Sequence, residues 1–118
     1  MITRAHRFHG YGSLRYIYRH GSTVRGPLCA TKYILNKRRK SYRLSIVVNK
    51  KVNRSAVARN RIRRRLYESA RLTETLIKDP YDIVVTVFTD QINDLTPEEL
   101  NRLVRAQFRQ AGIIASKS

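Results

Sequence analysis

The chain has 118 residues and a mass of 13.8 kDa, which suits one domain with a single core of modest size spanning the whole sequence, with its ordered part over about residues 7–112. A hydrophobic content of 42% excludes a disordered chain, and a formal net charge of +17 with a pI of about 11.1 indicates a polyanionic partner. No run reaches the roughly 20 apolar residues of a membrane span and the basic N-terminus lacks the apolar run of a signal peptide, so we expect a cytoplasmic protein.

The first part of the chain predicts a short helix and a strand. The helix begins at Ser13, a good N-cap, and stops at Gly21. The strand covers Leu28–Leu35, which is rich in β-formers after a Gly-Pro pair. The single cysteine, Cys29, excludes an internal disulfide, and we expect it to be a buried apolar filler.

A basic loop and a second strand follow. The loop is "NKRRKS", residues 36–41, and the strand "YRLSIVVN", residues 42–49, alternates apolar and polar positions with a period of two. Because the loop is short, we expect the two strands to form a hairpin.

The second half predicts a helix, a strand and a helix. The first helix has Ser55 as N-cap and ends near Lys78, before an Asp-Pro pair. The almost continuous apolar run Tyr81–Phe88 indicates a central strand buried on both faces. A capping box at Thr96 begins the last helix, which stops at Gly112. The residues alone thus give an α-β-β-α-β-α order, with room for a further strand in the loops, and an α+β fold.

Charge is distributed very unevenly along the chain. No Asp or Glu occurs from Met1 to Tyr67, a stretch that holds 19 of the 25 Lys and Arg. The remainder holds six Lys and Arg against all eight acids, a charge of −2. One face of the folded domain should therefore be strongly positive, and nucleic acid is a better counter-charge for it than an anionic membrane surface.

The arginines concentrate in the predicted helix "AVARNRIRRRLY". Its apolar face is predicted to contain Ile62, Leu66, Ala70, Thr73 and Ile77. Only Glu68 could pair with the arginines of the outer face, and Arg59 and Arg61 lie at the positive end of the helix dipole, where each cation costs roughly 0.3 to 1 kcal/mol. A bound phosphate would reverse that cost, so we predict nucleic-acid binding here.

Tyrosines favour RNA over DNA as the ligand. The basic half contains Tyr11, Tyr16, Tyr18, Tyr33 and Tyr42. Aromatic rings beside cations stack the unpaired bases of single-stranded RNA, and Tyr18 and Tyr33 are the best candidates for this role. No helix-turn-helix, zinc-finger or zipper pattern is present.

The segment "ARNRIRRRLYESAR" resembles the bacterial ribonuclease P protein subunit. The resemblance rests on Arg59-Asn60-Arg61 in a helix, the preceding strand and the pair Lys50-Lys51, and it extends from about Arg7, through a first helix that ends in His20-Gly21, to Gly112. It implies an α-β-β-β-α-β-α fold with a central sheet, in which the Arg-rich helix forms a left-handed βαβ crossover.

The resemblance also implies a function. The family's protein is the non-catalytic subunit of an endoribonuclease whose RNA carries the chemistry and removes the 5′ leader of precursor tRNA with Mg²⁺. Mg²⁺ would be bound mainly through the RNA partner and the substrate. The implied partners are the ribonuclease P RNA, in a 1:1 complex, and precursor tRNA, with no membrane.

Site residues follow from the motif positions. The resemblance implies contacts with the catalytic RNA from Lys50, Lys51, Arg59, Asn60, Arg61, Arg63 and Arg64. It implies a leader cleft between the first helix and the sheet, lined by Tyr18, Tyr33 and Leu14. No catalytic residue and no metal-binding residue is expected in the protein.

Two other functions remain open from the sequence. A protein ribonuclease could use His6, His9 and His20 as acid and base. A ribosomal protein or a general RNA-annealing factor would have the same charge and size, but it would not prefer precursor tRNA over mature tRNA.

Overall fold

The computed structural model describes residues 11–115. Over this range the chain forms three α-helices, four strands and two short 3-10 helices. Their order and bounds are α1 (Tyr11–His20), β1 (Ser22–Arg25), β2 (Cys29–Leu35), β3 (Arg43–Val47), α2 (Ala56–Arg71), η2 (Glu74–Leu76), β4 (Tyr81–Val87), η3 (Asp90–Asp94) and α3 (Pro97–Ala111). The α-β-β-β-α-β-α order and the α+β class are confirmed.

The four strands form one mixed sheet in the order β1-β2-β4-β3. β4 pairs antiparallel with β2 and parallel with β3. The predicted hairpin of β2 and β3 is therefore wrong, because β4 lies between them. An apolar strand such as β4 is stabilised by neighbours on both edges and cover on both faces, and α2 provides the long connection that the parallel β3–β4 pair requires.

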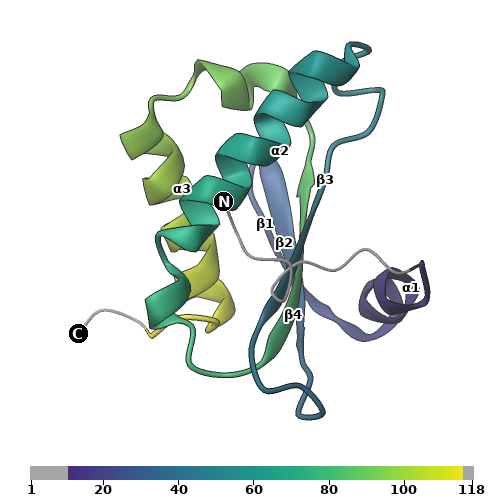
Figure 1. Ribbon diagram of the computed structural model, residues 1–118, viewed down its shortest axis with the longest axis vertical. Coiled ribbons are helices and arrows are strands. Elements are labelled where there is room, and N and C mark those ends of the chain that lie inside the picture. The colour runs from purple at the N-terminus through teal and green to yellow at the C-terminus, as the bar shows by residue number, and fades with distance from the viewer. Residues whose placement is uncertain (1–10, 116–118) are drawn as a thin grey trace.

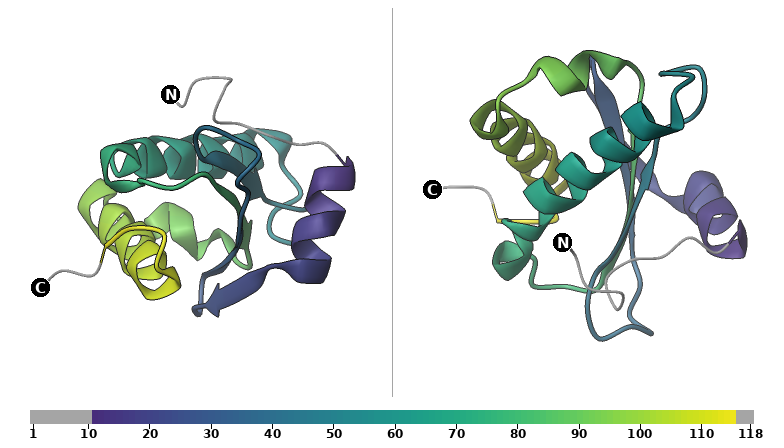
Figure 2. Two further views of the ribbon diagram at one scale, coloured as in Figure 1. Left: turned by 90° about the horizontal axis from the view of Figure 1, so that it is seen from below. Right: turned by 45° about the horizontal axis from the view of Figure 1, so that its top comes forward.

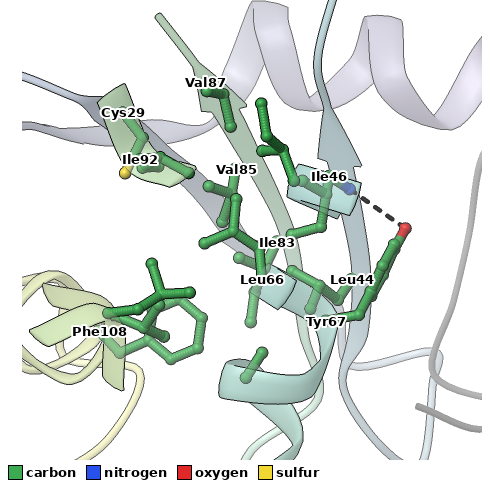
Figure 3. Close-up of a cluster of buried hydrophobic side chains, with 14 of the residues drawn as sticks. Cys29, Leu44, Ile46, Leu66, Tyr67, Ile83, Val85, Val87, Ile92 and Phe108 are labelled. Carbon is green, nitrogen blue, oxygen red and sulfur yellow. Dashed lines mark hydrogen bonds between the residues drawn. The ribbon is translucent and has the colours of Figure 1, made fainter. Parts of the chain in front are cut away.

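Helices cover both faces of the sheet. α1 packs alone on one face, whereas α2 and α3 pack side by side on the other (Figure 1, Figure 2). The main core lies between the sheet and α2 and α3, where strand residues such as Leu44, Ile46, Ile83 and Val85 meet Leu66 and Tyr67 of α2 and Phe108 of α3 (Figure 3). On the other face, which we call the α1 face, Ile17 packs against Val84.

Two helix boundaries differ from the sequence prediction. α1 begins at Tyr11 instead of Ser13, and α2 ends at Arg71 instead of near Lys78. Thr73 is fully buried beyond the helix end, and Ile77 forms an isolated β-bridge with Ile114. The apolar spacing of these two residues imitates a helix because a 3-10 turn returns them to the same core.

Other local signals are confirmed. Ser55 caps α2 by accepting from the Ala58 amide at 3.2 Å. Thr96 and Glu99 form a reciprocal capping box at α3, whose C-cap Gly112 has a φ of 82°.

The junction between α1 and β1 requires a glycine. The Gly21 amide donates to the Ile17 carbonyl at 2.7 Å, and β1 begins at the next residue. A Cβ at Gly21 would lie 2.7 Å from the Ile17 oxygen and 2.9 Å from the Tyr33 oxygen, both of them backbone atoms. This contact fixes how α1 leaves the sheet, and it brings β1, which the residues alone did not locate, alongside β2.

A buried polar cluster joins α3 to β2. The Gln107 amide donates to the Cys29 carbonyl at 2.9 Å, and its Oε1 accepts from the Thr31 hydroxyl at 2.6 Å and from the Cys29 thiol at 3.8 Å. Cys29 is therefore buried as predicted, with a polar partner added.

We expect the Cys29 thiol to resist modification in the folded protein. Burial raises its pKa from 9.0 to about 11, which outweighs the lowering by the Gln107 hydrogen bond. Because the folded-state pKa is the higher one, this group's contribution to stability is complete below pH 9 and is lost as the pH rises towards 11. Alkylation at pH 8, followed by mass spectrometry with and without denaturant, checks this. Equal rates in both conditions would contradict it.

Candidate nucleic-acid interface

Three arginines of α2, which are Arg59, Arg63 and Arg65, donate hydrogen bonds to backbone carbonyls of the protein itself. Arg65 donates to the carbonyls of Ile92, Asn93 and Leu95, and so fastens α2 to the η3 segment. Its guanidinium is occupied by backbone oxygens, which makes Arg65 a structural residue.

Arg59 and Arg63 hold the loop that connects β3 to α2. Arg59 Nη1 donates to the Asn53 and Arg54 carbonyls at 3.0 and 2.9 Å. Arg63 donates to the Val48 carbonyl at 3.4 Å and to the side-chain oxygen of Asn60. Both were predicted as RNA contacts, and the structure gives each a positioning role as well.

The remaining cations of this region face solvent. Arg61 and Arg64 are exposed on α2, and Val57, which precedes them by one and two turns, is 79% exposed. Lys50, Lys51 and Arg54 are exposed on the adjoining loop, where they line a shallow depression. We call Lys50, Lys51, Arg54, Arg61 and Arg64 the arginine face. The loop and the helix thus present five cations together at one end of the sheet.

Few carboxylates lie near the arginine face in the described part of the chain. Glu68 lies one turn beyond Arg64 and pairs with Arg71, whose hydrogen bond lowers the pKa of the Glu68 carboxyl. Asp90 accepts a hydrogen bond from the Asn53 side chain at 3.2 Å, beside Arg54. The five cations outnumber these two carboxylates, so the arginine face keeps a net positive charge, as a phosphate-binding surface does.

The α1 face carries aromatic rings beside cations. Tyr18 is 47% exposed, and the Lys32 amine lies 5.9 Å from the centre of its ring. Leu14 is half-buried against Ile17 and Val84, so it supports α1 and offers little free surface. Tyr18 with Lys32 can therefore stack a base and contact a phosphate at one place.

Tyr33 does not line the cleft between α1 and the sheet. Its side chain packs on the opposite face, against the main core, and its ring makes an edge contact with Tyr81 at 6.2 Å. Strand alternation puts Lys32 and Ile34 on the α1 face and Tyr33 on the other. The expected position of Tyr33 is therefore wrong, and Lys32 takes its place.

A second cation–aromatic pair was missed by the sequence analysis. The Arg25 guanidinium lies 4.6 Å from the centre of the Phe88 ring, and Phe88 is 37% exposed directly after β4. Phe88 had been assigned to a buried strand because its apolar neighbours continue up to it. The β1 strand that supplies Arg25 was not located from the residues alone.

Other chemistries find limited support. His20 is exposed and its ring lies 4.6 Å from that of Tyr16, whereas His6 and His9 lie outside the described residues. Between residues 11 and 115, no three His, Cys, Asp or Glu side chains come together as a metal site. In that same range no helix is long and apolar enough to cross a membrane.

Comparison with known proteins identifies the family. A family model described as Ribonuclease P matches residues 2–112. The chain is a member of the ribonuclease P protein family. It is 32% identical over 113 residues to the ribonuclease P protein component of Chloroflexus aurantiacus, which covers 96% of this chain and 82% of that protein. It is 38% identical over 73 residues to the Pseudanabaena protein of the same name, a match that covers 62% of this chain and 63% of its relative.

Solved structures agree with this assignment. The Staphylococcus aureus RNase P protein superimposes with a TM-score of 0.83 at 25% identity, over 94% of this chain and 99% of the other. The Thermotoga maritima RNase P protein has a TM-score of 0.70 at 22% identity and covers 85% of this chain, which supports the fold. The arginine face and the α1 face therefore lie on a ribonuclease P protein scaffold.

Proposed function

We propose that this chain is the protein subunit of a ribonucleoprotein ribonuclease P. It binds the catalytic RNA through the arginine face, and it binds the single-stranded 5′ leader of precursor tRNA on the α1 face. In this way it supports Mg²⁺-dependent removal of the leader. The observation that carries the proposal is that one small domain of this family has two chemically different surfaces at separate places, one made of exposed cations and one that sets an aromatic ring beside a cation.

Each surface suits one partner. Arg61 and Arg64 are exposed forks that fit the phosphates of a folded RNA, while Arg59 and Arg63 fix the loop that presents Lys50 and Lys51. Tyr18 and Lys32 suit an unpaired strand, because stacking accepts any base and the amine accepts a phosphate.

The remaining parts of the proposal concern the complex. A 1:1 complex with the ribonuclease P RNA in the cytoplasm, without a membrane partner, is proposed. Mg²⁺ is assigned to the RNA and the substrate. The described protein side chains do not fit a metal ion by themselves, so no step is derived through a protein-bound metal.

Precursor tRNA cleavage tests the function. At low Mg²⁺ we expect efficient cleavage only when this protein and a bacterial ribonuclease P RNA are combined. Cleavage by the protein alone would restore the histidine enzyme as the explanation. Equal affinity for precursor and mature tRNA would indicate a general RNA-binding protein.

Replacing Tyr18 with alanine tests the leader contact. We expect affinity of the assembled complex for precursor tRNA to fall by about 1 to 3 kcal/mol, since one stacking surface is lost, with mature tRNA affinity unchanged. Leu72→Ala is the matched control, because Leu72 is 48% exposed at the end of α2, on the other side of the sheet. An equal loss for both tRNAs would contradict leader binding at Tyr18.

A further inference from the structure

A second basic surface lies at the opposite end of the sheet from the arginine face. The loop between β2 and β3 contains four consecutive exposed cations, Lys37, Arg38, Arg39 and Lys40. The five residues of β3 lie between this loop and Lys50, so the two basic regions are separated by at least about 17 Å at 3.3 Å for each residue. The loop cations therefore form a surface distinct from the arginine face.

The loop is held in a defined conformation. The Asn36 side chain donates to Asp82 at 2.9 Å and accepts from the Arg38 amide at 3.2 Å. The Asn36 amide donates to the Pro80 carbonyl at 2.9 Å, and the Arg39 amide donates to the Asn36 carbonyl at 3.0 Å. These bonds tie the base of the loop to β4, so its cations are presented from a fixed backbone.

The nearest strand carboxylate does not compensate the loop. No Asp or Glu precedes Glu68 in the sequence, and β4 is the one described strand that follows it. Any carboxylate on a strand of the sheet must therefore come from β4, and that residue is Asp82. Asp82 accepts two hydrogen bonds from Arg43, each of 2.8 Å, so its charge is already matched. On the other side of the loop, Lys40 borders a depression with Glu74 and Asp79. Lys37, Arg38 and Arg39 are therefore the loop cations whose charge is not matched by a carboxylate among the described residues.

A pocket lies between this loop and the part of the α1 face that carries Tyr18 and Lys32. It is lined by Tyr16, Ile34, Leu35, Asn36 and Arg38 together with the Asp82–Arg43 ion pair. Tyr16 is 57% exposed and Ile34 lies beside it on the α1 face, so an aromatic ring and an apolar wall are available to a base, and Arg38 is available to its phosphate. Ile34 is two residues from Lys32 along β2, about 7 Å away on the same face. The pocket therefore continues the surface of Tyr18 and Lys32.

From this continuity we infer that the pocket and the loop residues 37–39 form a second single-strand RNA subsite. It holds leader nucleotides that extend beyond Tyr18, away from the arginine face and the catalytic RNA. The inference rests on the proposed function, since it names an additional part of the same substrate. It makes this chain selective for precursors with long leaders.

A series of precursor tRNAs with leaders lengthened one nucleotide at a time tests the inference, with the protein assembled on its RNA. For the unmodified protein, affinity should rise in two stages as the leader first covers Tyr18 and then reaches the pocket. The Lys37→Ala/Arg38→Ala/Arg39→Ala variant should lose only the second stage, by at least about tenfold, and its salt slope on long leaders should fall by about 2. Tyr16→Ala should also lose only the second stage, by about fivefold to a hundredfold.

The control removes an equal charge elsewhere. Arg102→Ala/Arg105→Ala/Arg109→Ala takes three cations from α3, on the other side of the sheet, and should keep both stages. If both triple variants lose the same affinity for long leaders, the loss is explained by net charge alone and the subsite is overturned. A loss that is independent of leader length would place the loop on the catalytic RNA and would also overturn it. Failure of the unmodified protein to prefer precursor over mature tRNA would instead reject the proposed function.

Discussion

Replacing Arg61 and Arg64 together with alanine should lower the affinity for ribonuclease P RNA by about 3 kcal/mol or more, over a hundredfold, because each lost charge-assisted hydrogen bond contributes about 1.5 to 3 kcal/mol. Both side chains are exposed on α2 and belong to the arginine face. The slope of log affinity against log salt should become shallower by about 2, since two phosphate contacts are removed. The thermal midpoint should stay the same, because neither arginine supports the fold.

Arg65→Ala is the informative comparison. Arg65 lies in the same helix, but its guanidinium is bound to three backbone carbonyls of the segment after β4. We expect this variant to lower the thermal midpoint and to change the salt slope little. Titration of the labelled RNA at several salt concentrations, together with thermal unfolding, separates the two roles. A stable Arg65→Ala protein with the larger loss of affinity would reverse our assignment.

Removing the carboxylate of Asp82 should cause the largest loss of stability. The Asp82 and Arg43 side chains are 6% and 15% exposed and share two hydrogen bonds of 2.8 Å across the parallel β3–β4 pair. Asp82→Ala removes the carboxylate that balances the largely buried Arg43 charge and accepts two of its hydrogen bonds, which costs about 3 to 5 kcal/mol. For a domain of this size we expect the thermal midpoint to fall by about 10 °C or more.

A double variant distinguishes the ion pair from simple loss of packing. In Arg43→Leu/Asp82→Leu the uncompensated charge is gone, so a substantial part of the stability should return. Thermal and urea unfolding of the single and double variants provide the measurement. If the double variant is as unstable as Asp82→Ala, then the contact with Asn36 and the packing of the loop, and not the charge, explain the loss.

Features that depend on neighbouring residues could be predicted from the sequence. The Ser55 cap, the Thr96 capping box and the Gly112 stop each rest on residues within one turn of each other, and all three are present. The central position of Tyr81–Val87 follows from its apolar run, which needs cover on both faces.

Features that depend on distant residues could not. The insertion of β4 between β2 and β3 pairs residues that are 39 to 58 positions apart in the chain, with no local signal. The face on which Tyr33 lies is decided by a register of period two, so an error of one residue reverses it. The sequence of α2 does not indicate which arginines bind backbone carbonyls and which face solvent, because a long side chain can point either way. In the structure Arg59, Arg63 and Arg65 bind carbonyls. Arg61 and Arg64 face solvent.

The position of β4 also affects how the protein is made. A nascent chain that has emerged only as far as Tyr67 carries β1, β2, β3 and most of α2, together with the 19 Lys and Arg of residues 1–67, but it lacks the strand that joins β2 to β3. Because chains leave the ribosome from the N-terminus, the two RNA surfaces cannot take their relative positions until Val87 has emerged. During that interval the nascent chain is a strongly cationic polypeptide beside ribosomal RNA, and specific assembly must await the last third of translation.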